Sequence, residues 1–209
     1  NYINIKNVAA VSSGTAAIHL ALILLGIKKD DIVICQSFTF VGTINPVMYL
    51  GAKPIFIDSE TDTWNIDPEN LKQAIKFYLN RGKKPKAIIV VHLYGMPVNM
   101  NEIMRYAKRK KILVIEDCAQ SLGSSINNKK TGTFGDLSIF SFHSNKIITT
   151  MGEGGMLVVN NKKFDRRVRA LIHNGVEPFK RKNQSIYWKP AINNIVKSHR
   201  NFWPYNFCM

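Results

Sequence analysis

The chain has 209 residues, of which 45% are hydrophobic and 10% aromatic, and its 29 lysines and arginines outnumber its 14 aspartates and glutamates. This composition excludes an intrinsically disordered chain, and the length suits one large α/β domain or two small ones. The longest apolar stretch, residues 16–25, is interrupted by His19 and is too short to span a bilayer.

Segments with strand and helix patterns alternate along the chain. In order, the patterns predict a strand at 8–11, a helix at 17–25, a strand at 31–35, a helix at 40–50, a strand at 53–58, a helix at 68–80, a strand at 86–92, a helix at 100–110, strands at 112–116, 137–141 and 156–159, and a helix at 163–173. After residue 174 the alternation is lost, and we predict no element there.

The predicted strands are nearly continuous apolar runs, which is typical of strands that are buried on both faces. Repeated strand–helix–strand units of this kind imply an α/β fold with a mainly parallel, seven-stranded sheet sandwiched by helices. Ligand sites in such sheets gather at the carboxyl ends of the strands. Polar residues that follow the strands are therefore the candidate site residues.

The formal net charge of +15 would suit a polyanionic partner such as nucleic acid. The basic residues stand in short runs between apolar segments, for example at 108–111, as solvent-facing helix ends do. We therefore expect neither a nucleic-acid partner nor a membrane partner. A basic surface would also suit a substrate that carries phosphates.

The three cysteines, Cys35, Cys118 and Cys208, are far apart and odd in number. Their spacing matches neither a disulfide framework nor a metal site, so we predict no metal. Free thiols of this kind are typical of a reducing compartment, and we expect the protein to be cytoplasmic.

The first candidate site is the segment Ser12-Ser13-Gly14-Thr15, between a predicted strand and a predicted helix. Gly14 would let the backbone approach a ligand closely, and the helix N-terminus would offer N–H groups to a phosphate. A plain turn with a serine cap explains the segment as well. The chain contains neither GxxxxGK[ST] nor GxGxxG, which disfavours a P-loop or a Rossmann nucleotide site.

The second and third candidates are Asp117 and Lys146. Asp117 directly follows a buried strand, where a carboxylate is costly unless it is paired, and a protonated ring nitrogen would be a suitable partner. Lys146 has no acidic residue within five positions and precedes the glycine-rich stretch 152–155, so it could act as a nucleophilic amine beside a bulky ligand. A structural ion pair and a surface lysine are the alternative interpretations.

Taken together, the three candidates supply what pyridoxal phosphate requires, namely a phosphate anchor, an acid for the pyridine nitrogen and a Schiff-base lysine. The sequence resembles the DegT/DnrJ/EryC1/StrS family of sugar aminotransferases, which have fold type I. The resemblance is carried by VSSGTAAIHLAL (11–22), SFTFVGTINPVMYLGAKPIFID (37–58), VVHLYG (90–95), IEDCAQSLG (115–123), GTFGDLSIFSFHSNKIITTMGEGGML (132–157) and WPYNFCM (203–209).

The resemblance implies roles for residues around the cofactor ring. Lys146 would form the Schiff base and move the proton between the substrate carbon and the cofactor. Asp117 would keep the pyridine nitrogen protonated. Gln120 would contact the ring hydroxyl or the ring face, and Phe40 would stack on the ring.

The resemblance also implies that Gly14, Thr15 and Ser141 bind the phosphate. Asn206 would reach the phosphate of a neighbouring subunit, because the active sites of the family lie at a homodimer interface. The family tends to have Arg two positions after this Asn, whereas this chain has Cys208. We expect residues 1–175 to be the PLP-binding large domain without an N-terminal arm, and 176–209 to lead toward a C-terminal domain.

The resemblance implies transamination of a nucleotide-linked ketosugar, with glutamate as the expected donor, to give an aminosugar for polysaccharide or antibiotic sugar synthesis. A few family members have His in place of the lysine and act as dehydratases, so Lys146 favours transamination. We assign no role to His92, His143 or His173. A dehydratase, a non-catalytic relative and a basic binding module stay open as alternatives.

Overall fold

The computed structural model describes residues 2–160, 162–172, 176–180 and 186–190, which fall into two compact units, 1–160 and 161–209. The second unit contains α5 (Lys162–Ile172), close to the predicted helix, and an unpredicted antiparallel pair, β10 (Val176–Lys180) and β11 (Ile186–Pro190). The predicted domain boundary at residue 175 stays a prediction.

The first unit is built on a seven-stranded sheet with the order β1-β9-β8-β5-β4-β2-β3. Strands β3, β2, β4, β5 and β8 run parallel, and β9 runs antiparallel to both of its neighbours, β8 and β1. The strands are β1 (Val8–Val11), β2 (Ile32–Gln36), β3 (Lys53–Ile57), β4 (Ala87–Val91), β5 (Leu113–Asp117), β8 (Leu137–Ser141) and β9 (Gly155–Val159). The predicted mainly parallel sheet of seven strands is thereby confirmed.

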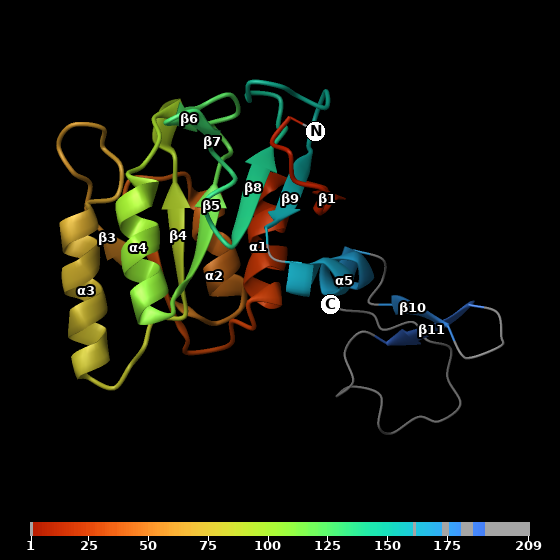
Figure 1. The fold of residues 1–209 in the computed structure, drawn as a ribbon, viewed down its shortest axis with the longest axis horizontal. Helices are drawn as coiled ribbons and strands as arrows, with labels where there is room; N and C mark the ends of the chain where they lie inside the picture. Colours follow the sequence, from red (N-terminus) through yellow and green to blue (C-terminus); the bar gives the residue numbers. More distant parts are fainter. Residues whose placement is uncertain (1, 161, 173–175, 181–185, 191–209) are drawn as a thin grey trace. The chain divides into compact units, whose positions relative to one another are not determined.

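Helices cover both faces of this sheet. In Figure 1, α3 (Pro68–Asn80) and α4 (Met100–Lys110) lie in front of the sheet, whereas α1 (Gly14–Leu24) and α2 (Asn45–Tyr49) lie behind it. Among the residues that the structure describes, every helix is too short or too polar to cross a membrane.

The side chains of the strands alternate between the two faces, as the period of two in a β-strand requires. On the front face, Ile88, Val90 and Val114 pack in one buried cluster with Leu71 of α3 and Ile103 of α4. Ile115 and Asp117, which alternate with Val114 along β5, lie on the other face, which α1 covers. One strand therefore contributes to two separate environments.

The predicted helix at 40–50 is not continuous. It consists of a 3-10 turn, η1 (Val41–Thr43), followed by α2. The backbone before η1 is extended at Phe40 (φ −72°, ψ 141°), and Pro46 in the first turn of α2 has no N–H with which to continue hydrogen bonding from the preceding turn. The break buries Thr43 beside the candidate site.

Two further short elements escaped prediction. A hairpin joins β6 (Ser125–Ile126) to β7 (Lys129–Lys130) through Asn127 and Asn128, which both have positive φ, at 48° and 62°. Two central residues with positive φ are what a tight hairpin turn requires, and the Asn-Asn pair is the signal that would have predicted it. The other element is the 3-10 turn η2 (Leu93–Gly95), directly after β4.

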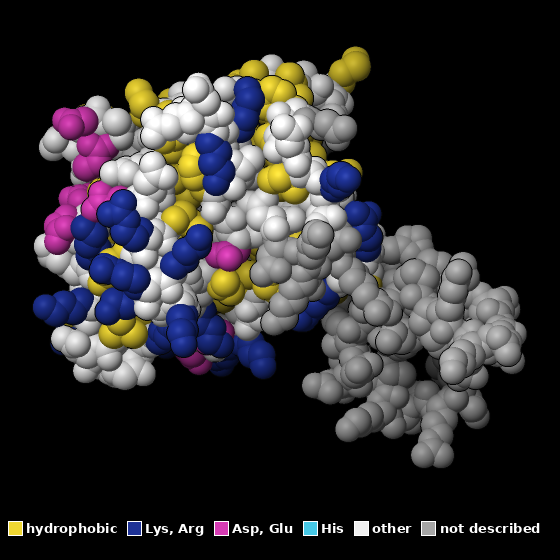
Figure 2. Space-filling view, in the orientation of Figure 1, with side chains coloured by type: hydrophobic (Ala, Val, Ile, Leu, Met, Phe, Trp, Pro, Cys, Tyr) yellow, Lys and Arg dark blue, Asp and Glu magenta, His cyan; other side chains and the backbone are white. Residues whose placement is uncertain are grey.

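Basic side chains are spread over the face that α3 and α4 form (Figure 2). The last turn of α4 carries Lys108, Arg109 and Lys110, which complement the negative end of the helix dipole. Lys72 bridges two carboxylates, with its Nζ 2.9 Å from Glu69 Oε2 and 2.7 Å from Glu102 Oε1. Acidic side chains therefore interrupt this basic surface.

Candidate active site

A pocket of about 290 Å³ lies where β4, β5 and β8 end and α1 begins. Seven of the eight predicted site residues line it: Gly14, Thr15, Phe40, Asp117, Gln120, Ser141 and Lys146. The eighth, Asn206, lies outside the described residues. The parallel sheet brings these residues together because its strands end at one edge, as the sequence analysis expects.

Asp117 is the last residue of β5 and is only 4% exposed. Its Oδ2 accepts a hydrogen bond from Thr43 Oγ1 at 2.8 Å, and its Oδ1 accepts one from the backbone N–H of Ala119 at 3.0 Å. Burial raises the pKa of Asp117 above its usual value, although these hydrogen bonds and the charge of Lys146 act in the opposite direction. A cationic N–H group in the pocket would therefore gain strongly by pairing with this carboxylate.

Thr43 is a contact that the sequence analysis missed. It is 2% exposed, and its hydroxyl donates to Asp117 and also lies 2.9 Å from Thr39 Oγ1. The break between η1 and α2 places Thr43 beside Asp117. The prediction of a continuous helix at 40–50 gave no indication of this contact. A chain of two hydroxyls therefore leads from Asp117 along the wall of the pocket.

The phosphate end of the predicted site is the start of α1. Ser13 caps the helix, with its Oγ accepting a hydrogen bond from the backbone N–H of Ala16 at 3.1 Å. The other N–H groups of the first turn, at Gly14 and Thr15, have no partner within a helix. Together with the positive end of the helix dipole, they form a candidate anion site beside the Thr15 and Ser141 hydroxyls.

Two glycines permit the close packing around this anion site. A Cβ atom on Gly14 would lie 2.9 Å from Ser141 Cβ, and one on Gly155 would lie 2.3 Å from the Ser13 carbonyl. Any larger residue would push α1 away from β8 or β9. The glycine-rich stretch that follows Lys146 therefore serves to seat the start of α1 against the sheet.

Lys146 lies in the turn that follows β8, and it is half-buried. Its backbone N–H donates to the His143 carbonyl at 2.9 Å. The ring of His143 lies between two partners, with Nε2 3.1 Å from Glu153 Oε1 and Nδ1 3.0 Å from Asn145 Oδ1. His143, Asn145 and Glu153 also line the pocket, although the sequence analysis gave none of them a role.

Gln120 and Phe40 form other parts of the pocket wall. The Gln120 Oε1 atom accepts a hydrogen bond from the backbone N–H of Tyr94 at 2.8 Å. With its oxygen engaged in this way, Gln120 would offer its amide N–H groups to a ligand. The side chain of Phe40 is 70% exposed, so its ring is accessible to a flat ligand that enters the pocket.

The fold and the site together define the class of this protein. Its mainly parallel sheet with helices on both faces matches solved structures of fold type I aminotransferases. A buried aspartate and a lysine lie at the ends of its strands. The chain belongs to the DegT/DnrJ/EryC1/StrS aminotransferase family, which it matches over residues 1–195.

Individual relatives support the assignment to this family. The chain is 46% identical over 164 residues to the GDP-perosamine synthase of Escherichia coli O157:H7, an alignment that covers 78% of this chain and 43% of that protein. A DegT DnrJ EryC1 StrS aminotransferase from Brucella abortus superposes with a TM-score of 0.82 at 33% identity, over 88% of this chain and 50% of the other. The E. coli GDP-4-keto-6-deoxy-D-mannose-3-dehydratase with bound hydrated PLP superposes with a TM-score of 0.76 at 32% identity, over 83% of this chain and 44% of the other.

The chain spans about half the length of the curated relatives that it matches, with coverage of 45%, 43% and 48% in three of them. The residues that the family matches, 1–195, include every residue that lines the pocket.

Proposed function

We propose that this chain is the cofactor-binding part of a pyridoxal phosphate-dependent aminotransferase, which transfers an amino group to the keto group of a nucleotide-linked sugar. Glutamate is the proposed donor. The observation that carries the proposal is the pocket itself, where Asp117, Lys146 and the N-terminus of α1 meet. None of these features specifies the cofactor alone, but together they offer the phosphate anchor, the acid and the amine that pyridoxal phosphate requires.

The residues present fit pyridoxal phosphate at three points. The buried Asp117 carboxyl, whose pKa burial raises, would be stabilised as an anion by a protonated ring nitrogen. The first turn of α1, packed closely on Ser141 through Gly14, would hold the phosphate. Phe40 and Gln120 line the same pocket and would contact the ring.

When bound, the cofactor would supply the carbonyl that accepts an amino group and the ring that delocalises the electron pair left on the substrate carbon. The Lys146 amine would hold the cofactor covalently until a substrate amine replaces it. Once released, the same amine would take the proton from the donor carbon and later return a proton to the sugar carbon. The Asp117 carboxylate would keep a proton on the ring nitrogen throughout.

The proposed substrate class rests on the relatives and on the identity of residue 146. Several relatives are named GDP-perosamine synthase, so a GDP-linked ketosugar is the first substrate to test. Lys146 supports transamination over dehydration, because the dehydratases of the family have His at this position. The aminosugar product would serve polysaccharide or antibiotic sugar synthesis.

We further propose a homodimer with shared active sites, located in the cytoplasm, with no nucleic-acid or membrane partner. The apolar side chains of Phe40, Val41 and Tyr94 are 70%, 56% and 76% exposed near the pocket, which supports a second subunit that covers them. Cys35 and Cys118 are free and buried, which suits a reducing compartment. The third cysteine, Cys208, lies outside the described residues.

The test is to incubate the complete protein with nucleotide-linked ketosugars and glutamate and to detect products by mass. An aminosugar from at least one substrate, and its loss in Lys146→Ala, would support the proposal. Borohydride reduction should fix the cofactor to Lys146. A deoxysugar would instead indicate a dehydratase, and a colourless protein that binds no pyridoxal phosphate would refute the enzyme assignment. Salt-dependent DNA binding by such a protein would favour the basic binding module.

A further inference from the structure

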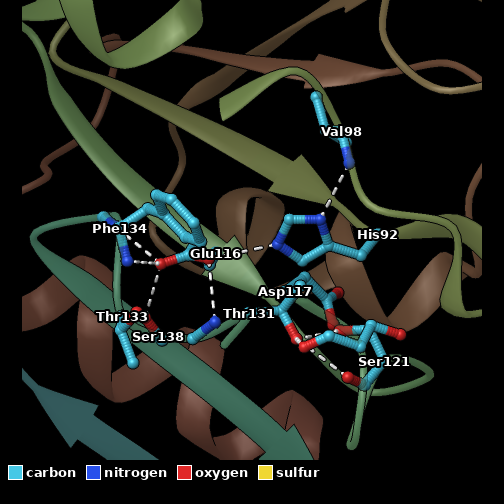
Figure 3. Close-up of polar contacts among 12 residues, drawn as sticks. His92, Val98, Glu116, Asp117, Ser121, Thr131, Thr133, Phe134 and Ser138 are labelled. Atoms are coloured by element: carbon cyan, nitrogen blue, oxygen red, sulfur yellow. Dashed lines mark hydrogen bonds and ion pairs between the residues drawn. The ribbon is translucent and has the colours of Figure 1, made fainter. Parts of the chain in front are cut away.

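Glu116 lies beside Asp117 in β5, and the alternation of the strand places it on the opposite face of the sheet, the face on which Val114 packs with α3 and α4. Its carboxylate is directed toward His92 and Phe134 (Figure 3). It is fully buried, at 0% exposed. Its carboxylate accepts from five groups: the backbone N–H of Gly132 at 2.8 Å, those of Phe134 and Gly135 at 2.6 Å each, Ser138 Oγ at 3.2 Å and His92 Nε2 at 3.1 Å. Such complete satisfaction is what keeps a buried carboxylate stable.

The hydrogen bonds of His92 determine its tautomer. The backbone N–H of Val98 donates to Nδ1 at 3.1 Å, so Nδ1 carries no proton. The proton of the neutral ring must then be on Nε2, which donates to Glu116. His92 therefore links Glu116 to the backbone six residues further along the chain.

This arrangement also explains why the cluster is a hydrogen-bonded unit rather than a metal site. His92, Glu116 and Cys118 place potential ligand atoms within 4.8 Å of one another. However, a metal needs a lone pair on the imidazole, and Nε2 holds the proton while Nδ1 accepts from Val98. Burial alone would raise the pKa of Glu116, but the hydrogen bonds from His92 and from the Gly135 and Gly132 backbone more than offset it, so the pKa is lowered.

The 92–98 loop that His92 closes forms part of the pocket wall. Leu93 lines the pocket, and Tyr94 donates its backbone N–H to Gln120. Tyr94 has φ 49°, a left-handed conformation that a non-glycine residue keeps only when its surroundings hold it. Asn65 holds the loop at two points, accepting from the Leu93 N–H and donating to the Met96 carbonyl, and the His92 ring accepts from the Val98 N–H at the far end of the loop.

The other donors to Glu116 come from the turn at 132–135, just before β8. That strand ends at Ser141 in the pocket and leads directly to Lys146. Both segments that Glu116 holds therefore continue into the site on the other side of the sheet.

We propose that Glu116 is a positioning residue for the pocket, acting with His92: it fastens the 92–98 loop and the turn at 132–135 to β5 and thereby sets the position of Gln120. It touches neither substrate nor cofactor. The proposal concerns the pocket wall, and it therefore holds or fails independently of which substrate the protein uses.

The first test is hydrogen exchange in Glu116→Gln, measured on the complete protein without cofactor. Glutamine offers one acceptor oxygen, so its NH₂ group would face donors of the 132–135 turn or of His92. We expect the backbone N–H of Tyr94 to exchange at least about tenfold faster, because the His92 ring, which holds the Val98 end of the loop, loses its own anchor on Glu116. This result does not depend on any cofactor.

The matched control is Ile75→Ala, which removes a fully buried side chain from α3 in the same core cluster. It should lower the melting temperature by a comparable amount while leaving Tyr94 exchange near that of the wild type. If Ile75→Ala accelerates hydrogen exchange at the Tyr94 N–H as much as Glu116→Gln does, the effect is general destabilisation and the proposal fails.

Substitutions of His92 provide a second route if Glu116→Gln does not fold. A glutamine at this position would keep a donor for Glu116 and an acceptor for the Val98 N–H, whereas a leucine would keep neither. We therefore expect His92→Gln to preserve Tyr94 protection and His92→Leu to lose it. Equal protection in both variants would overturn the role of His92.

The second readout is the dissociation constant of pyridoxal phosphate in a double-mutant cycle. If Glu116 acts through Gln120, Glu116→Gln should weaken binding about tenfold, and much less when Gln120→Ala is already present. Additive effects would show that Glu116 does not act through Gln120. A protein that binds no pyridoxal phosphate at all would refute the proposed function, but the exchange test would still decide the proposal on Glu116.

Discussion

The two acidic residues at the end of β5 are adjacent in sequence and both buried, yet they lie in opposite chemical environments. Asp117 faces α1 and accepts two hydrogen bonds at the wall of an open pocket. Glu116 faces α3 and α4 and accepts five in a closed interior. The pKa of Asp117 is raised by burial, whereas that of Glu116 is lowered because its hydrogen bonds outweigh its burial.

The difference shows how one strand separates reactivity from stability. A buried carboxyl with few donors and an open pocket beside it is prepared to bind a cation, while a fully satisfied carboxylate acts as an anchor. The alternation of the strand assigns the two roles to its two faces. Substitutions on the pocket side should therefore reduce activity, and those on the other side should reduce stability.

The largest effect on the pocket side should come from Lys146→Ala. Loss of the amine that moves the proton should reduce amino transfer by at least about 10⁴-fold, or roughly 5.5 kcal/mol. The free energy of unfolding should change by less than about 0.5 kcal/mol, because the side chain is half-buried in a turn. Rate measurements check the loss of amino transfer, and thermal melting checks the stability. Substitution of an exposed lysine, Lys83→Ala, is the control and should alter neither the rate nor the stability. A stable, fully active Lys146→Ala protein would contradict the assignment.

Asp117→Asn should reduce amino transfer by about 10²- to 10³-fold, or roughly 3–4 kcal/mol, because the charge opposite the ring nitrogen is lost. Without cofactor, its stability should equal or exceed that of the wild type at neutral pH. The folded wild type binds the Asp117 proton more tightly than the unfolded chain, so its stability falls as pH rises from the usual value of 3.8 through the raised pKa. Denaturant unfolding at several pH values should show the advantage of the variant shrinking toward acid pH, and a constant difference would argue against a raised pKa.

Glu116→Gln should have the reverse profile. At neutral pH it should lower the free energy of unfolding by about 3 kcal/mol, since buried donors lose their partner. The folded pKa of Glu116 lies below its usual value of 4.5, so its contribution is present above pH 4.5 and is lost as pH falls through the folded pKa. The same unfolding series should therefore show the deficit of the variant shrinking in acid. An increased stability of this variant at neutral pH would remove the contrast with Asp117.

The smallest effect should come from Ser13→Ala, at the start of α1. Loss of the cap to Ala16 should lower the free energy of unfolding by about 1 kcal/mol, and Ser13→Asp should restore most of it. Thermal melting of the two variants checks this. Because the Ser13 hydroxyl bonds to the Ala16 N–H and to neither carboxylate, its substitution should leave the opposite pH profiles of Asp117→Asn and Glu116→Gln unchanged.

Much of the site could be predicted from the sequence because its residues follow recognisable strands. Asp117 and Ser141 end two apolar strands. Gly14 comes shortly after a third strand and directly follows Ser13, the cap of α1. Strands that run parallel end at one edge, so predicting the strands was enough to predict the meeting of their ends. The helix at 40–50 was the weak point, because apolar spacing gave no sign of the break that positions Thr43.

The sequence by itself determined the alternation of strands and helices, the parallel sheet and the list of residues at its carboxyl edge, because these follow from local periodicity and chain order. Only the tertiary structure decided which partners Glu116, Asp117 and His92 meet. Their contacts with Thr43, with Gly132 and between His92 and Glu116 join residues 16 to 74 positions apart. The period of two along β5 places its acidic residues on opposite faces, but it does not determine which elements cover each face. Strand order and helix placement determine the surroundings of each residue, because they form a pocket on the Asp117 side of the sheet and bring five donors to Glu116 on the other side.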